Sequence, residues 1–213
     1  MLPNPLARAC GFDHDKQNPR GYRFPDSGRI DPCDCERDCF RNTCLNAGCD
    51  VYCTKTNCSI RGRCSNSVYE CKGIELMITE FGLGVRATSC ISVGSVMGEY
   101  LGTLTTHDYE KDEETTNEYA MKLQTRSVTK EVVYIDAAEC GGMIRFINHS
   151  CEAKCVFVEM RNRRQVKVLV LVKNPIMIGE EVTVGYGDDL WVSCTCGQRS
   201  CCSLVALDQG SVQ

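Results

Sequence analysis

Residues 145–151 read Arg-Phe-Ile-Asn-His-Ser-Cys, and they carry the most specific signal in the chain. The Asn148-His149 pair offers a side-chain amide, an imidazole and two backbone amides at one place. Cys151 adds a thiol, and three more follow downstream, at Cys194, Cys196 and Cys201. Because four thiols complete one tetrahedral zinc site, we expect a metal ion to pin the C-terminal segment against Asn148 and His149. The pattern predicts a cofactor pocket covered by a zinc-held flap.

Length and composition place the chain among globular proteins. Its 213 residues suffice for one substantial domain with a smaller appendage. A hydrophobic content of 43% and a charged content of 24% are ordinary for a soluble protein. No apolar run approaches the roughly 20 residues of a membrane span, and the N-terminus lacks the layout of a signal peptide. We expect a soluble, intracellular protein with no membrane partner.

The cysteine content is high and uneven. Of the 18 cysteines, eight lie between Cys33 and Cys64 and four between Cys194 and Cys202. Such density indicates either a disulfide framework or metal sites. An intracellular compartment disfavours disulfides, so we favour zinc.

The charge indicates what the protein binds. The formal net charge is −4, and about eleven zinc-bound thiolates on about three zinc ions would lower it to about −9. Phosphate contacts need a basic face, so direct nucleic-acid binding is not expected. A basic peptide is the better partner.

The N-terminal arm, residues 1–31, is polar and rich in Pro, Gly and Arg. We expect it to be poorly ordered, with a substrate-binding or docking role as the alternative.

The next segment, from Asp31 to Asn66, has hardly any apolar periodicity. It cannot form a hydrophobic core, so metal must supply its folding free energy, on the order of 10 kcal/mol per structural zinc. Eight thiols could serve two separate four-cysteine sites, and seven could serve two sites that share a bridging sulfur. These eight are Cys33, Cys35, Cys39, Cys44, Cys49, Cys53, Cys58 and Cys64.

From Gly73 onward, apolar and polar residues alternate, which is typical of strands. The pattern predicts a β-rich domain, with one helix in the charged run from His107 to Asn117. We also expect a glycine turn at Phe81–Ala87 between two strands, although a lone Gly-x-Gly is weak evidence for any ligand. The expected strands are Ile74–Thr79, Val96–Leu101, Glu118–Leu123, Glu131–Asp136, Val156–Met160 and Gln165–Lys173.

Two of these segments resemble parts of a known family. The run Cys44-Leu-Asn, with the spacing to Cys64-Ser-Asn, resembles the AWS (associated-with-SET) segment that precedes the SET domain in one branch of lysine methyltransferases. Gly82-Leu83-Gly84 resembles the Gly-Trp-Gly that opens the SET domain, with Leu83 in place of tryptophan. In the AWS segment seven cysteines hold two zinc ions, and Cys49 is left spare. The resemblance assigns this role to Cys33, Cys35, Cys39, Cys44, Cys53, Cys58 and Cys64.

Together, residues 33–202 resemble a SET-domain histone-lysine methyltransferase of the histone H3 lysine-36 branch. The resemblance implies a mainly β fold, the SET β-clip with a pseudoknot, divided into an AWS segment (32–72), a SET domain (73–190) and a post-SET segment (191–213). It also implies three zinc ions, the third on Cys151, Cys194, Cys196 and Cys201. The contacts it implies for S-adenosylmethionine are Gly82, Leu83, Gly84, Tyr119, Arg145, Asn148 and His149.

The catalytic assignments also follow from the resemblance. Methyl transfer needs a neutral amine, although free lysine has a pKa of about 10.4. A narrow aromatic channel disfavours the ammonium by desolvation and aligns the reacting atoms. We assign Tyr186 to orienting the amine and Tyr119 to the channel wall; the alternative for each is a core tyrosine. Trp191 either covers the cofactor or packs the post-SET segment.

One difference from the family's sequence pattern affects the expected reaction product. The family carries Phe or Tyr two residues before the catalytic tyrosine, and Val184 stands there instead. The smaller side chain leaves space for a methylated amine, so di- or trimethylation is expected.

The expected function is S-adenosylmethionine-dependent methylation of a histone H3 tail or nucleosome, in the nucleus on chromatin. Lysine-36 is the favoured target and lysine-9 the next. The alternatives are a catalytically weak SET module that binds chromatin partners, for which Leu83 and Val184 are the only support, and a non-histone lysine methyltransferase.

Overall fold

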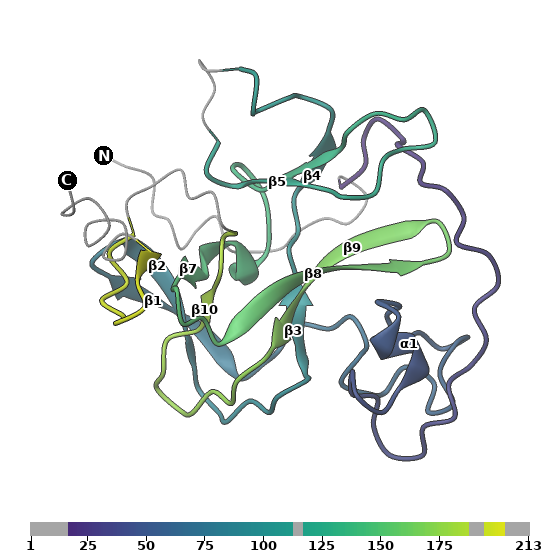
Figure 1. Cartoon of the computed structure of the whole chain (residues 1–213), viewed down its shortest axis with the longest axis horizontal. Coiled ribbons are helices and arrows are strands. Elements are labelled where there is room, and N and C mark those ends of the chain that lie inside the picture. Colours follow the sequence, from purple (N-terminus) through teal and green to yellow (C-terminus); the bar gives the residue numbers. More distant parts are fainter. Residues whose placement is uncertain (1–16, 113–116, 188–193, 203–213) are drawn as a thin grey trace, which may run out of the picture.

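The computed structural model describes residues 17–112, 117–187 and 194–202. They form the mainly β fold expected, arranged as three sheets (Figure 1). The central sheet has the order β3 (Val96–Glu99), β9 (Gln165–Val172), β8 (Cys155–Asn162), β10 (Thr183–Val184), β7 (Asn148–His149). A second sheet has the order β4 (Thr103–Thr105), β6 (Tyr134–Asp136), β5 (Ala120–Lys122). The third is the hairpin of β1 (Ile74–Thr79) and β2 (Gly82–Ala87).

Helices are short in the described part of the chain. They are α1 (Leu45–Gly48), in the cysteine-rich segment, and the 3-10 helix η3 (Met143–Phe146), which leads into β7. None of the helices described is long and apolar enough to cross a membrane. The helix expected over residues 107–117 is wrong for residues 107–112, which contain a turn; residues 113–116 lie outside the described residues.

Strand positions largely follow the alternation of the sequence, and β1 has the expected bounds. The glycine turn is a correction: Gly82-Leu83-Gly84 lies within β2, and the reversal occurs between Thr79 and Gly82. Gly82 adopts φ +104°, a conformation that favours glycine because it lacks a Cβ.

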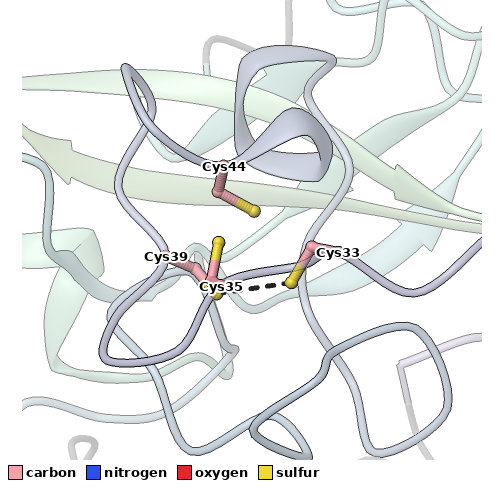
Figure 2. Close-up of side chains that lie close together, drawn as sticks. All are labelled: Cys33, Cys35, Cys39 and Cys44. Carbon is pink, nitrogen blue, oxygen red and sulfur yellow. Dashed lines mark hydrogen bonds between the residues drawn. The ribbon is translucent and has the colours of Figure 1, made fainter.

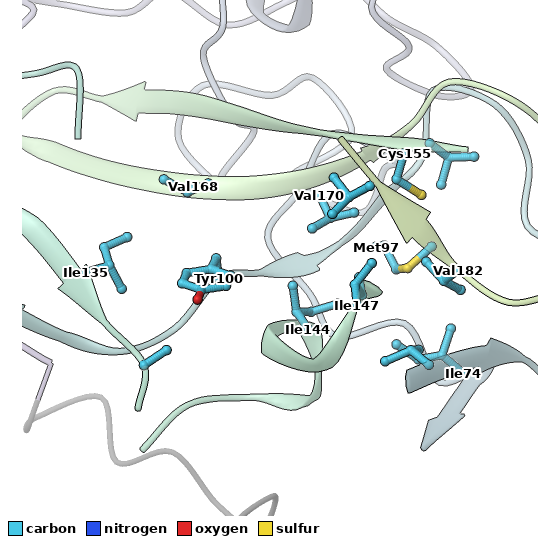
Figure 3. Packing of buried hydrophobic residues seen from close by; sticks show 14 of the residues in the cluster. Ile74, Met97, Tyr100, Ile135, Ile144, Ile147, Cys155, Val168, Val170 and Val182 are labelled. Atoms are coloured by element: carbon cyan, nitrogen blue, oxygen red, sulfur yellow. The ribbon is translucent and has the colours of Figure 1, made fainter. Parts of the chain in front are cut away.

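Strand β9 is shared by two hydrophobic clusters because side chains alternate between the faces of a strand. Val168 and Val170 join the main core, which also contains Ile135, Ile144 and Ile147 (Figure 3). On the opposite face, Leu169 and Leu171 pack with Tyr52, Val96 and Met160. Since Tyr52 belongs to the cysteine-rich segment, this second cluster fastens that segment to the sheet.

The cysteine-rich segment, residues 31–66, contains α1 (Figure 1) and packs internally around sulfur. Buried asparagine amides complete its interior by satisfying backbone groups. Asn46 donates to the carbonyl of Asn57 at 2.7 Å, and Asn66 donates to the carbonyl of Val51 at 2.8 Å. The expected lack of an aliphatic core in this segment is confirmed.

The described part of the N-terminal arm, residues 17–31, is packed, which corrects the expectation of a poorly ordered arm. Phe24 is buried in the main core. The amide of Leu104 donates to the carbonyl of Gln17 at 2.7 Å, and that of Val128 donates to the carbonyl of Arg23 at 2.8 Å. Residues 1–16 lie outside the described residues.

Because β9 packs into both hydrophobic clusters, we expect Leu169→Ala to lower the stability of the fold strongly. Leu169 is 0% exposed, and a buried Leu→Ala change costs about 2–5 kcal/mol of unfolding free energy. Val156→Ala, at a 39% exposed position on β8, is the control and should change stability far less. Urea denaturation of both variants at a fixed zinc concentration measures this, and equal shifts would contradict it.

Candidate functional site

The site is built on the insertion of β10 between β7 and β8. Strand β10 runs parallel to β7, with Thr183 opposite Asn148 and Val184 opposite His149. Val184 also pairs with Cys155 of β8. This brings Tyr186, two residues beyond β10, beside the Asn-His pair. The expected pseudoknot, with the C-terminal segment beneath a preceding loop, stays a prediction.

Asn148 faces the glycine-containing strand β2. Its side-chain amide donates to Glu181 Oε1 at 2.8 Å and to Thr79 Oγ1 at 3.4 Å. A Cβ at Gly84 would lie 2.9 Å from both Asn148 Nδ2 and Glu181 Oε1, so a larger residue there would displace these side chains. Leu83 is half-buried beside it. The structure therefore brings together Gly84 and Asn148, two of the residues expected to bind the cofactor.

His149 connects the tyrosine to the cysteines. The backbone N–H of Tyr186 donates to His149 Nδ1 at 3.2 Å, and Nε2 lies 3.5 Å from Cys151 Sγ. Because Nδ1 accepts, the ring proton lies on Nε2 and points at the sulfur. Burial lowers the pKa of His149, which favours this neutral form. The ring therefore holds the backbone at Tyr186 in place relative to Cys151.

Tyr186 lies in an aromatic environment. Its hydroxyl donates to the carbonyl of Ile147 at 2.9 Å. Burial raises the pKa of Tyr186 to about 12, and the neighbouring Tyr119, Glu118 and Glu181 add to the rise. Tyr119 is half-buried, with its ring 6.3 Å from that of Phe146 at an angle of 77°. The two tyrosines assigned to the channel are therefore neighbours.

Arg145 is buried and anchored in the core. Its guanidinium donates to the carbonyl of Ala137 at 2.6 Å and lies 4.7 Å from the centroid of the Phe146 ring. These contacts fix η3, which carries the chain into β7. Cofactor contact by Arg145 stays a prediction, as does that by Tyr119.

The cysteines of the N-terminal segment gather as expected for zinc. Cys33, Cys35, Cys39 and Cys44 have sulfurs within 4.8 Å of one another (Figure 2). A second such group comprises Cys33, Cys39, Cys53 and Cys58. Cys64 Sγ lies 3.9 Å from Cys58 Sγ, so all seven cysteines that the resemblance assigns belong to one double cluster.

Two cysteines, Cys33 and Cys39, are common to both groups. Cys39 is 0% exposed, and its sulfur lies 3.7 Å from that of Cys33 and 3.8 Å from that of Cys58. Its central position makes Cys39 our candidate for the bridging sulfur. Cys49 is exposed and outside both groups, as the resemblance implied.

The C-terminal cluster contains one unexpected member. Cys151, Cys194, Cys201 and Cys202 have sulfurs within 4.8 Å of one another. Cys196, expected as a ligand, is outside this group, although its thiol contacts those of Cys151 and Cys194. Cys202, to which the resemblance assigns no role, is inside it. Trp191 lies outside the described residues.

The donor chemistry fits zinc in all three groups. Burial raises the pKa of the Cys39 thiol, whereas a hydrogen bond from Cys53 lowers that of Cys64 to about 5. Without a cation, neighbouring thiols therefore cannot all be thiolates at one pH. Zinc stabilises every thiolate at once, and four-cysteine sets are its usual structural site.

A sequence profile of the SET domain matches residues 82–187, about half of the chain. This stretch contains the glycines of β2, the Asn-His pair and Tyr186. The chain belongs to the SET-domain family.

Named relatives agree with this assignment. A Cryptococcus neoformans histone-lysine N-methyltransferase, H3 lysine-36 specific, is 28% identical over 186 residues, which cover 80% of this chain and 21% of that protein. The Drosophila melanogaster histone-lysine N-methyltransferase ash1 is 28% identical over 208 residues, covering 90% of this chain and 8% of that protein. The chain thus spans about a fifth of the first relative's length and less of the second's.

Among solved structures, KRYPTONITE in complex with mCHH DNA, an H3(1-15) peptide and SAH has a TM-score of 0.61 and 22% identity. The match covers 86% of this chain and 45% of that one. The likeness supports the SET fold.

Sequence reasoning missed two residues at this site. Glu181 is one of 28 acidic residues, and only the register of β10 shows that it faces Asn148. Tyr100 is buried and donates to the backbone carbonyl of Tyr119 at 2.9 Å. Tyr100 lies at the end of an apolar run, and the sequence there does not indicate a hydrogen bond to Tyr119.

If the sulfur of Cys39 bridges the two N-terminal zinc sites, both sites lose a ligand in Cys39→Ser. This variant should then release about two of about three zinc ions. Cys49→Ser, in the same segment, should release none. Metal analysis of the desalted proteins measures the zinc content, and loss of only one ion from Cys39→Ser would show that Cys39 does not bridge.

Proposed function

We propose that this chain is the catalytic part of an S-adenosylmethionine-dependent protein-lysine methyltransferase that acts on the histone H3 tail. The observation that carries the proposal is the parallel pairing of β7 with β10 within a SET domain, which places Asn148 and His149 beside Tyr186. The names of the relatives support the same activity.

The cofactor pocket lies between β2 and β7. The backbone of Gly82, Leu83 and Gly84 would approach the cofactor from the Gly82 end, where a Cβ would meet nothing within 4 Å. Asn148 would offer its side-chain amide, held in place by Glu181 and Thr79. When bound, S-adenosylmethionine supplies a methyl group activated by its sulfonium. SAH in the similar structure supports this cofactor.

Tyr186 orients the substrate amine and does not act as its base. With a pKa of about 12, its hydroxyl stays protonated at neutral pH. Because the hydroxyl proton points to the carbonyl of Ile147, the oxygen presents lone pairs that accept an N–H from an incoming amine. Tyr119 supplies a neighbouring aromatic wall. Desolvation in this setting favours the neutral amine that the transfer requires.

The substrate is a basic peptide. The formal charge is −4 before any thiolate is counted, and Glu118 is an exposed acidic residue near Tyr186. The name of the Cryptococcus relative favours lysine-36 of histone H3, and lysine-9 is the second choice. Action on histones implies a nuclear, chromatin-bound location.

The alternative of a catalytically weak SET module relied on the departures at Leu83 and Val184. Both residues lie in paired strands, β2 and β10, with the register of the site intact. A radiolabelled methyl-transfer assay on core histones separates the two functions, because a binding module would show no incorporation.

Tyr186→Phe should reduce methyl transfer on the order of 100-fold or more, since orientation of the amine is lost. Cofactor affinity, measured by calorimetry with SAH, should be unchanged. Tyr69→Phe, at a 43% exposed position outside the site, is the control. Near-normal turnover in Tyr186→Phe would remove this residue from the mechanism.

The degree of lysine methylation in the product gives a second test of the site. Val184 is 0% exposed at the position where the family carries Phe or Tyr, so we expect di- or trimethyl-lysine. Mass spectrometry after exhaustive reaction identifies the product. A monomethyl product alone would contradict the argument from side-chain size.

A further inference from the structure

We propose that Asn117 and Asp136 are positioning residues that hold Tyr119 at the wall of the substrate channel. Neither residue is among the cofactor-binding or channel residues described above. They act in series on the backbone of Tyr119: Asp136 orients the side chain of Asn117, and Asn117 holds the N–H of Tyr119. The inference rests on the proposed function, because that function gives Tyr119 its place in the channel.

The backbone of Tyr119 is held on both sides. Its carbonyl accepts the hydroxyl of Tyr100 at 2.9 Å and the N–H of Ala137 at 3.1 Å. Its N–H donates to Asn117 Oδ1 at 2.9 Å, a side-chain-to-backbone contact that asparagine makes with the residue two positions on. Regular pairing of β5 with β6 begins one residue later, at Ala120. The side chain of Asn117 therefore extends the fixed backbone beyond the end of the sheet.

Asp136 fixes the orientation of the Asn117 amide. Its Oδ1 accepts the side-chain N–H of Asn117 at 2.8 Å. The same carboxylate accepts the backbone N–H of Ala138 at 3.0 Å and the hydroxyl of Tyr109 at 2.7 Å. Burial raises the pKa of Asp136, but these hydrogen bonds outweigh burial and lower it, so the carboxyl is ionised at neutral pH. An ionised carboxylate only accepts hydrogen bonds. It therefore selects Nδ2 of Asn117 and leaves Oδ1 for the N–H of Tyr119.

The position of this backbone decides where the Tyr119 ring lies. The side chain is half-buried, with its ring 6.3 Å from that of Phe146. Tyr119 also lies close enough to Tyr186 to contribute to its raised pKa. A misplacement of about 1 Å in a catalytic site can cost on the order of 100-fold in rate. The two positioning residues therefore affect how well the channel wall aligns the amine.

Asn117→Ala removes the acceptor of the Tyr119 N–H. We expect kcat for methyl transfer to core histones to fall about tenfold. The affinity for SAH and its binding stoichiometry, both measured by calorimetry, should be unchanged, which shows that the variant is folded. Tyr109→Phe is the matched control, because it removes a different hydrogen bond to the same Asp136 carboxylate and should leave kcat unchanged. Equal losses of kcat in the two variants would overturn the inference.

Asp136→Asn tests whether Asp136 acts through Asn117. A carboxamide can present either its oxygen or its nitrogen to Asn117, so the orientation of Asn117 is no longer fixed and kcat should fall about threefold. In the double variant with Asn117→Ala, kcat should be no lower than in Asn117→Ala alone, because effects that pass through one contact are not additive. A further loss in the double variant, about as large as that of Asp136→Asn alone, would contradict action in series.

Hydrogen exchange gives a reading that does not depend on turnover. The amide of Tyr119 should exchange about tenfold faster in Asn117→Ala than in the unaltered protein, because its hydrogen bond is lost. Tyr109→Phe should leave this rate unchanged, and an unchanged rate in Asn117→Ala would overturn the inference. Absence of methyl transfer by the unaltered protein would instead refute the proposed function, and the exchange rates would still decide whether Asn117 holds Tyr119.

Discussion

The parallel pairing of β10 with β7 is the constraint on which the site depends. It joins segments more than thirty residues apart, with Thr183 opposite Asn148 and Val184 opposite His149. A slip of β10 by one residue would turn the Glu181 carboxylate away from the Asn148 amide, because side chains alternate along a strand. The buried Val184, which pairs on both sides, holds this register. The fine geometry of the pocket is thus fixed by hydrophobic packing.

His149 links this pairing to the metal chemistry. One ring nitrogen accepts the N–H of Tyr186 and the other faces Cys151. A zinc ion in the C-terminal cluster would fix the sulfur against which the imidazole is oriented. An effect of that ion on residues 194–202 would then reach Tyr186 through the side chain of His149. At the other end of the chain, zinc would replace the hydrophobic core that the cysteine-rich segment lacks, and β9 joins that segment to the sheet.

The sequence predicted the features that depend on local pattern. Alternation located β1, β8 and β9, and the family resemblance found the Asn148-His149 pair and Tyr186, which the structure brings together. The sequence pattern did not locate β2, which lies in a glycine-containing stretch, because glycine suggests a turn. The packing of residues 17–31 depends on distant partners such as Leu104. Spacing also did not indicate that Cys202 lies close to Cys151, a proximity that depends on the turn before Cys201. The zinc ligands, cofactor contacts and segment bounds stay predictions.

In the proposed methyl transfer, the charges around Tyr186 have two opposed effects on the substrate lysine. Glu118 and Glu181 lie close enough to raise the pKa of Tyr186, and the same field attracts a lysine ammonium. That field also raises the pKa of lysine and so opposes deprotonation. Since Tyr186 stays protonated at neutral pH, it cannot remove the proton. In the proposed mechanism, desolvation lowers the lysine pKa as the side chain passes from Glu118 to the space between Tyr119 and Tyr186, and the proton leaves to water. The proposal therefore has electrostatic attraction near Glu118 and desolvation between the two tyrosines act in sequence on the same lysine.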